Sequence, residues 1–127
     1  QDIVLKAICS LINTQGGTLI IGVHERDNIK EVIGIDREGF KSAEAYERHL
    51  SQLVINEFNE TIASKYVETK IIQLDGKSCC KVTCDMKSDE MPLFFRDKVF
   101  VRTGPMVCEL STMQVAEMVA ARKPFLN

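Results

Sequence analysis

The fold is decided by the stretch Gly16-Gly17-Thr18-Leu19-Ile20-Ile21-Gly22-Val23. A run of apolar and β-branched residues between glycines is typical of a buried strand, which we expect over residues 18–23. In a dinucleotide-binding fingerprint the glycines lie after a strand and open a helix, so that phosphate meets the helix N-terminus. Here the order is reversed, which excludes a Rossmann phosphate site.

The residues before this stretch predict a helix that ends near Asn13-Thr14. Asp2 is suited to cap its start, and the glycine pair offers the left-handed conformation that often ends a helix. Apolar side chains cover more than half of the predicted helix in two neighbouring rows, which are Ile3, Ala7, Leu11 and Val4, Ile8, Ile12. We therefore expect this helix to be packed inside the fold.

The residues after the stretch predict a hairpin and a second helix. His24–Lys30 is polar and predicts a turn, and residues 31–35 predict the returning strand. Ser42 is suited to cap a helix that runs to about Ala63, with an apolar stripe at helical spacing.

The second half of the chain predicts two further hairpins and a last helix. Asp75-Gly76 is a strong two-residue turn signal between strands over residues 67–74 and 77–85. Residues 93–96 and 99–102 predict a tight hairpin around Asp97, and Thr103-Gly104-Pro105 is expected to end the sheet. Ser111 and Gln114 form a capping box, with Leu110 and Val115 in staple positions. The predicted class is α+β, a mainly antiparallel mixed sheet packed with three helices.

Length and composition indicate one globular domain over residues 1–127. The chain is 45% hydrophobic and 27% charged, and it contains neither a membrane-spanning apolar run nor a signal peptide. Its five cysteines form an odd, unpatterned set, which favours reduced, buried thiols and a cytoplasmic protein. Because the first residue is Gln1 and not Met, we expect a fragment of a longer protein.

Two local motifs suggest sites that their context does not support. Gly76-Lys77-Ser78 resembles the end of a phosphate-binding loop, but the required earlier glycine is replaced by Ile71, and a strand follows in place of a helix. His24 and Glu25, with Asp27, could hold a hard cation such as Mg²⁺, although an exposed turn commonly has the same composition. We find no nucleophile–base arrangement with defensible spacing.

Basic residues are concentrated in the later part of the chain. Residues 1–60 carry 6 basic and 10 acidic side chains, a net of −4, whereas residues 61–104 carry 8 and 6, a net of +2. Arg96, Lys98 and Arg102 lie among Phe94, Phe95 and Phe100, a combination that binds nucleic acid through charge and base stacking. The same periodicity also fits phenylalanines in the core and charges in solvent. Lys77 and Lys81 are possible helpers in binding.

Three segments together resemble the AlbA_2 domain of Schlafen-type proteins. The first is the helix ending in Asn13-Thr14, followed by the glycine pair and the strand that closes in Gly22-Val23. The second is Val32-Ile33-Gly34-Ile35, and the third is Val99-Phe100-Val101-Arg102-Thr103-Gly104 followed by Glu109-Leu110-Ser111. The resemblance covers nearly the whole chain, and its first motif is specific.

This resemblance implies a mixed α+β fold and nucleic-acid binding, often beside a regulatory segment in microbial proteins. Some vertebrate members are metal-dependent ribonucleases, whose carboxylates come from two glutamates before the first helix and an acidic residue after the Gly-Val. Here His24 departs from that pattern and Glu25 is the candidate catalytic residue, with His24 and Glu25 as candidate metal ligands. The glutamate segment would lie upstream of Gln1, so Mg²⁺ is implied only for the full-length protein.

We therefore expect a regulatory nucleic-acid-binding module, for DNA or RNA, in a microbial cytoplasmic protein such as a transcriptional regulator. Weak binding by one copy favours a homodimer, and no membrane partner is expected. The first alternative is part of a metal-dependent nuclease completed by upstream carboxylates. The second is a protein-interaction or dimerisation domain, which the acidic pI of about 5.7 suits.

Overall fold

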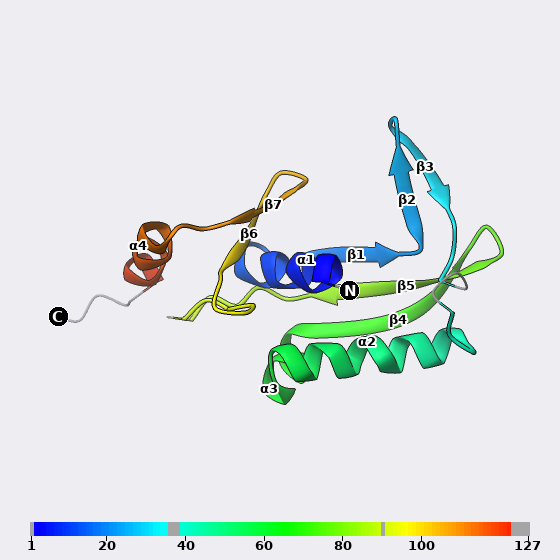
Figure 1. Ribbon diagram of the computed structural model, residues 1–127, viewed down its shortest axis with the longest axis horizontal. Coiled ribbons are helices and arrows are strands. Elements are labelled where there is room, and N and C mark those ends of the chain that lie inside the picture. The colour runs from blue at the N-terminus through cyan, green and yellow to red at the C-terminus, as the bar shows by residue number, and fades with distance from the viewer. Residues whose placement is uncertain (1, 36–38, 90, 123–127) are drawn as a thin grey trace. The chain divides into compact units, whose positions relative to one another are not determined.

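The computed structural model describes residues 2–35, 39–89 and 91–122, and these form two compact units (Figure 1). One unit spans residues 18–83, and the other comprises the residues up to 17 and from 84 onward. The chain is of the α+β class, as predicted, but the described residues contain four helices in place of three. Their strands form one three-stranded sheet and two separate hairpins in place of a single sheet.

The three-stranded sheet has the order β1-β5-β4 and belongs to the unit of residues 18–83. Its strands are β1 (Gly17–Ile21), β4 (Val67–Leu74) and β5 (Lys77–Cys84). The Asp75-Gly76 turn joins β4 and β5 as predicted, with φ angles of 50° and 73°, because a type I′ turn needs positive φ at both positions. The central strand β5 carries buried side chains on both faces, which are Cys79 on one and Cys80, Val82 and Cys84 on the other.

A second hairpin, β2 (Val23–Arg26) with β3 (Ile29–Val32), extends away from this sheet (Figure 1). We predicted residues 24–30 as a turn and paired the following strand with residues 18–23, and both predictions are wrong. The chain bends at Gly22, where φ is +107° and an added Cβ would lie 3.0 Å from the Cys79 sulfur. The Gly22 carbonyl accepts hydrogen bonds from the backbone of Ile33 and Gly34, which fixes the base of the new hairpin.

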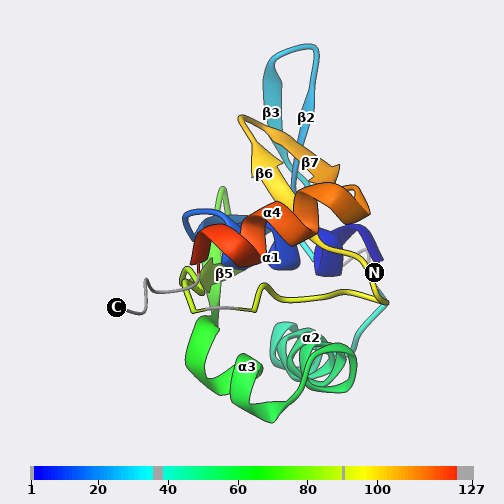
Figure 2. The same cartoon turned by 90° about the vertical axis from the view of Figure 1, so that its left-hand side faces the viewer.

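The predicted second helix is two helices, α2 (Ala43–Glu57) and α3 (Glu60–Tyr66). Ser42 caps α2 as predicted, with its hydroxyl accepting from the Ala45 amide. Asn59 interrupts the run because its side chain accepts from the Ile62 amide and starts a new helix. Figure 2 shows α2 end-on with α3 beside it, leading into the sheet strands.

In the other unit, α1 (Asp2–Asn13) packs against β6 (Phe100–Thr103) and β7 (Met106–Glu109). Most of α1 is buried, as its apolar rows predicted, although Ile3 is 83% exposed. Asp2 is the first helical residue and not the predicted cap. The strand β7 was missed, because Gly104-Pro105 forms a two-residue turn that joins β6 to β7 where we predicted the end of the sheet. Gly104 has a φ of 58°, which suits the first central position of a type II′ turn.

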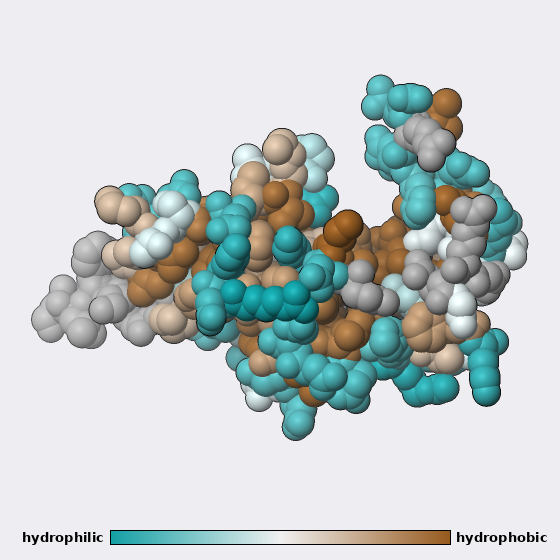
Figure 3. All heavy atoms as spheres, in the orientation of Figure 1, coloured by the Kyte–Doolittle hydropathy of each residue, from teal (hydrophilic) through white to brown (hydrophobic). Residues whose placement is uncertain are grey.

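The predicted hairpin around Asp97 is reduced to a turn with one bridge, between Phe95 and Lys98. The last helix, α4 (Thr112–Arg122), begins with the predicted capping box between Ser111 and Gln114. None of its residues is buried, and the space-filling view shows apolar atoms at the surface over this helix (Figure 3). Among the residues described, no helix has the length and apolar character needed to cross a membrane.

All five cysteines are free thiols, and only Cys108 is partly exposed. Burial raises the pKa of the Cys9 and Cys80 thiols to about 11 and that of Cys84 to about 12. These folded-state pKa values lie above the ordinary value of 9.0. The protonated thiols therefore make their full contribution to the stability of the fold below pH 9.0. That contribution is lost as the pH rises through 11 to 12.

We expect the native protein at about pH 8 to expose a single reactive thiol, since reaction requires an accessible thiolate. Ellman's reagent should modify Cys108 rapidly and the other four cysteines only after unfolding in guanidinium. The Cys108→Ser variant is the control and should lack the fast phase. A fast phase of two or more thiols per chain would contradict the burial described.

Candidate nucleic-acid interface

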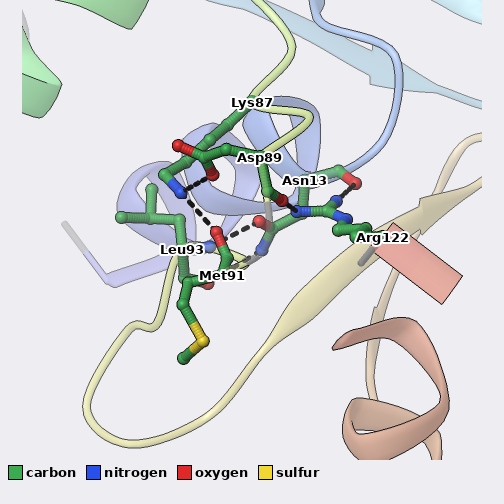
Figure 4. Close-up of polar contacts among 6 residues, drawn as sticks. All are labelled: Asn13, Lys87, Asp89, Met91, Leu93 and Arg122. Carbon is green, nitrogen blue, oxygen red and sulfur yellow. Dashed lines mark hydrogen bonds and ion pairs between the residues drawn. The ribbon is translucent and has the colours of Figure 1, made fainter. Parts of the chain in front are cut away.

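Asn13 ties the end of α1 to two segments far along the sequence, and Figure 4 shows its contact with the first of them, at Leu93. Its side-chain NH₂ donates to the Leu93 carbonyl at 2.9 Å and to the Phe100 carbonyl at 3.0 Å. Its side-chain oxygen accepts from the Leu93 amide at 2.7 Å. Because Asn13 is buried, these bonds position the segment that carries the predicted cations.

The next residue, Thr14, extends the same connection. Its hydroxyl donates to the Ser10 carbonyl at 2.7 Å and accepts from the Arg102 backbone amide at 2.8 Å. Lys87, on the loop before Leu93, bonds the Asp89 carboxylate and the Met91 carbonyl through its ammonium group. The Asn-Thr pair of the sequence motif is thus a structural clamp within this unit.

Two of the predicted cations share one groove of about 180 Å³. Arg96 and Lys98 project from the turn, and their side chains are 54% and 58% exposed. The groove is completed by Asp2, Lys6, Phe95, Phe100 and Glu109. We refer to it as the cationic groove.

Each carboxylate of the cationic groove is engaged by a cation. Arg96 donates to Asp2 at 2.9 Å, and the Lys98 ammonium lies 3.4 Å from Glu109. The third cation, Lys6, lies 5.5 Å from the centre of the Phe100 ring. The groove therefore carries three cations and two carboxylates, all at the surface.

The phenylalanines of this segment divide between core and surface. Phe95 and Phe100 are buried, as expected if they face the core, whereas Phe94 is 37% exposed. Arg96 also lies over the Phe95 ring, with its guanidinium carbon 4.8 Å from the ring centre. Stacking on a base is thus open to Phe94 but not to the two buried rings.

The remaining predicted cations lie elsewhere. Arg102 lines a different pocket of the same unit, with Thr14, Gln15, Gly16 and Gly104. Lys77 and Lys81 are exposed on β5 in the other unit, where the Lys77 ammonium donates to the Val32 carbonyl at 3.2 Å.

His24 and Glu25, the candidate metal ligands, do not converge. They are consecutive residues of β2, so their side chains point to opposite faces of the hairpin. His24 pairs across the hairpin with Glu31, and Glu25 pairs with Lys30. Glu25 and Lys30 border an apolar groove of about 370 Å³ with Ile20, Val23, Val32 and Leu74. Within residues 2–35, 39–89 and 91–122 there is no cluster of three His, Cys, Asp or Glu side chains able to hold a metal.

Sequence reasoning missed two contributors to the sites, Lys6 and Gln15. Lys6 is the one basic residue of α1, placed four residues after Asp2, and this spacing puts both on one face of the helix. That signal was available in the sequence. Gln15 carries no comparable signal, since a polar residue in a turn is ordinary.

The structure thus defines an α+β protein whose motif residues clamp a cation-bearing segment onto its first helix. A family model described as Schlafen, AlbA_2 matches residues 1–111, and the chain belongs to that family. No curated protein and no solved structure matches the chain.

Proposed function

We propose that this chain is a regulatory nucleic-acid-binding module and that the cationic groove is its contact surface. The observation that carries the proposal is the gathering of Lys6, Arg96 and Lys98 in one exposed groove. Family membership supports it, since AlbA_2 domains are often linked to nucleic-acid binding.

The carboxylates in the groove do not prevent phosphate binding. Exposed ion pairs contribute about 0–1 kcal/mol each, so a phosphate can replace Asp2 or Glu109 as the partner of a cation at small cost. Binding also releases the counterions condensed on the nucleic acid, and this gain favours phosphate over a protein carboxylate.

The backbone at Arg96 is a second supporting observation. Its φ is 51°, a left-handed conformation that costs a residue other than glycine roughly 1–2 kcal/mol. Residues held in such conformations are concentrated at functional sites. The left-handed conformation of Arg96 therefore supports a role for its side chain.

One copy offers a small cationic surface, so we propose that the protein binds as a homodimer. Two linked contact surfaces raise the effective affinity without any new contact, provided that both reach the same nucleic acid. Two-fold symmetry is the commonest arrangement for such a pair.

We expect weak and salt-sensitive binding of oligonucleotides. Contact of three cations with phosphates predicts a fall in affinity of roughly 20- to 40-fold between about 50 and 200 mM salt. The Arg96→Ala/Lys98→Ala variant should bind at least about tenfold more weakly at low salt and show a shallower salt dependence. Fluorescence anisotropy with labelled single- and double-stranded RNA and DNA measures both effects, and its stoichiometry tests the dimer.

The matched control is Lys41→Ala/Arg48→Ala, which removes two exposed cations from the other unit and so changes the net charge equally. Its affinity should stay close to that of the wild type. Equal losses in the two variants would show that total charge, and not the proposed surface, determines binding. Absence of binding at low salt, or equal binding by the wild type and Arg96→Ala/Lys98→Ala, would favour the interaction-domain alternative.

A further inference from the structure

A pocket of about 290 Å³ lies where two motif segments of the sequence meet. Thr14, Gln15 and Gly16 come from the end of α1, and Arg102 and Gly104 come from β6 and the turn after it. The pocket shares no lining residue with the cationic groove. Among the residues that the structure describes, its lining includes one arginine and no carboxylate.

Arg102 is held in place, and none of the described residues forms a hydrogen bond with its terminal nitrogens. Its backbone amide is bound by Thr14, and its Nε donates to the Gly104 carbonyl at 3.3 Å. These contacts fix the base of the side chain, so that the two terminal NH₂ groups form a preset fork of donors. Across the part of the chain that the structure describes, no carboxylate forms an ion pair with Arg102.

The nearby end of α1 would ordinarily oppose an anion, because the last carbonyls of a helix carry partial negative charge. Here those carbonyls are all occupied by donors. The Ser10 carbonyl accepts from the Thr14 hydroxyl, and that of Leu11 accepts from the Thr14 and Gly16 amides. The Ile12 carbonyl accepts from the Lys87 amide, and that of Asn13 accepts from Arg122 at 3.1 Å. These donors offset the unfavourable field.

We propose that this pocket binds a phosphate group through the Arg102 guanidinium and the side-chain amide of Gln15. A guanidinium fork matches two phosphate oxygens, and the exposed Gln15 amide adds a neutral donor. The inference deepens the proposed function, on which it rests if the phosphate belongs to a nucleic-acid backbone. A free phosphate group would fit the same donors, and the experiment separates the two sources.

The test is an amide NMR titration of the ¹⁵N-labelled protein. Sodium phosphate is added at constant ionic strength against sodium chloride, and a short single-stranded oligonucleotide is added to a second sample. We expect saturable shifts at the amides of Gln15, Gly16 and Gly104 and at the Arg102 Nε–H. The Arg102→Gln variant should weaken phosphate binding at least about tenfold, because charge-assisted hydrogen bonds are lost.

Two further variants test whether the shifts come from binding in this pocket. Gln15→Glu places a carboxylate in the pocket at an exposed position and should abolish the shifts without unfolding the protein. Arg48→Gln removes an exposed arginine of α2 in the other unit and should leave the shifts unchanged. Shifts that are absent, or that survive both Arg102→Gln and Gln15→Glu, overturn the proposal.

The titrations with phosphate and with the oligonucleotide test the pocket proposal separately from the proposed function. Pocket shifts with the oligonucleotide assign the site to the nucleic-acid backbone, and shifts with phosphate alone assign it to free phosphate groups. If the oligonucleotide binds while the pocket amides respond to neither ligand, the pocket proposal is wrong and the proposed function stands. If phosphate saturates the pocket and no oligonucleotide binds, the proposed function is wrong and the pocket stands.

Discussion

Replacing Asn13 by Ala is expected to lower the free energy of unfolding by about 4 kcal/mol, a large share of the roughly 5–15 kcal/mol of a whole domain. The substitution removes the partner of the buried Leu93 amide and Phe100 carbonyl, and it leaves the Leu93 carbonyl with only the weak thiol donor of Cys9 at 3.4 Å. Each such buried group costs about 1–3 kcal/mol when it is unpaired. Urea unfolding followed by circular dichroism measures the loss.

Asn56→Ala is the matched control, because the Asn56 side chain is exposed and accepts a hydrogen bond from Gln52 on the neighbouring turn of its helix. It should change stability by less than about 0.5 kcal/mol. Asn13→Asp should do no better than Asn13→Ala at neutral pH, since a carboxylate oxygen would then face two carbonyl oxygens in place of the donating NH₂. A loss below about 1 kcal/mol for Asn13→Ala would show that the clamp is dispensable.

Gly16→Ala should destabilise the protein by about 3 kcal/mol, from two separate causes. Gly16 has a φ of +71°, and an added Cβ would lie 2.6 Å from the Cys84 carbonyl oxygen and 3.2 Å from the Met86 nitrogen. Both neighbours are backbone atoms, so relief requires that a chain segment move.

Gly76→Ala separates the two causes. Gly76 has nearly the same φ, +73°, but an added Cβ there has no atom within 4 Å. It should therefore cost only the roughly 1–2 kcal/mol of the left-handed conformation. Equal losses at the two positions in denaturant unfolding would contradict the close approach of backbone at Gly16.

The parts of the fold that the sequence predicted correctly are those with local signals. Asp75-Gly76 defined a hairpin whose first strand, over residues 67–74, has the predicted bounds. Ser42 and the Ser111–Gln114 box marked the starts of two helices, because capping requires only residues a few positions apart.

The wrong predictions arose where local signals gave no guide. In the projecting hairpin, neither His24 nor Glu25 of β2 needs to be buried. The alternation of apolar and polar residues that usually indicates a strand is therefore absent there. At Asn59 a continuous apolar stripe concealed the boundary between α2 and α3. Gly104-Pro105 was interpreted as the end of a sheet, although a glycine in the first position also makes a tight hairpin turn.

The candidate site was predicted in composition but not in arrangement. Arg96, Lys98 and Arg102 do lie in one unit, but the partner of Arg96 is Asp2, 94 residues away in the sequence. An ion pair of that separation depends on tertiary structure and leaves no pattern in the sequence. The division of the cations between a groove and a pocket is likewise a product of how α1 meets β6.

The clamp at Asn13 also means that α1 is synthesised well before its hydrogen-bond partners. The hydrogen bonds that complete the last turn of α1 come from residues 80, 87 and 109 positions later in the chain. During synthesis, which proceeds at about 5–20 residues per second, this helix emerges early and waits several seconds for those partners. Until they arrive its apolar rows lack their β6 neighbours, and its Ile12 and Asn13 carbonyls depend on water. The newly made helix α1 is thus vulnerable to aggregation, and translation must pass residue 122 before it is fully protected.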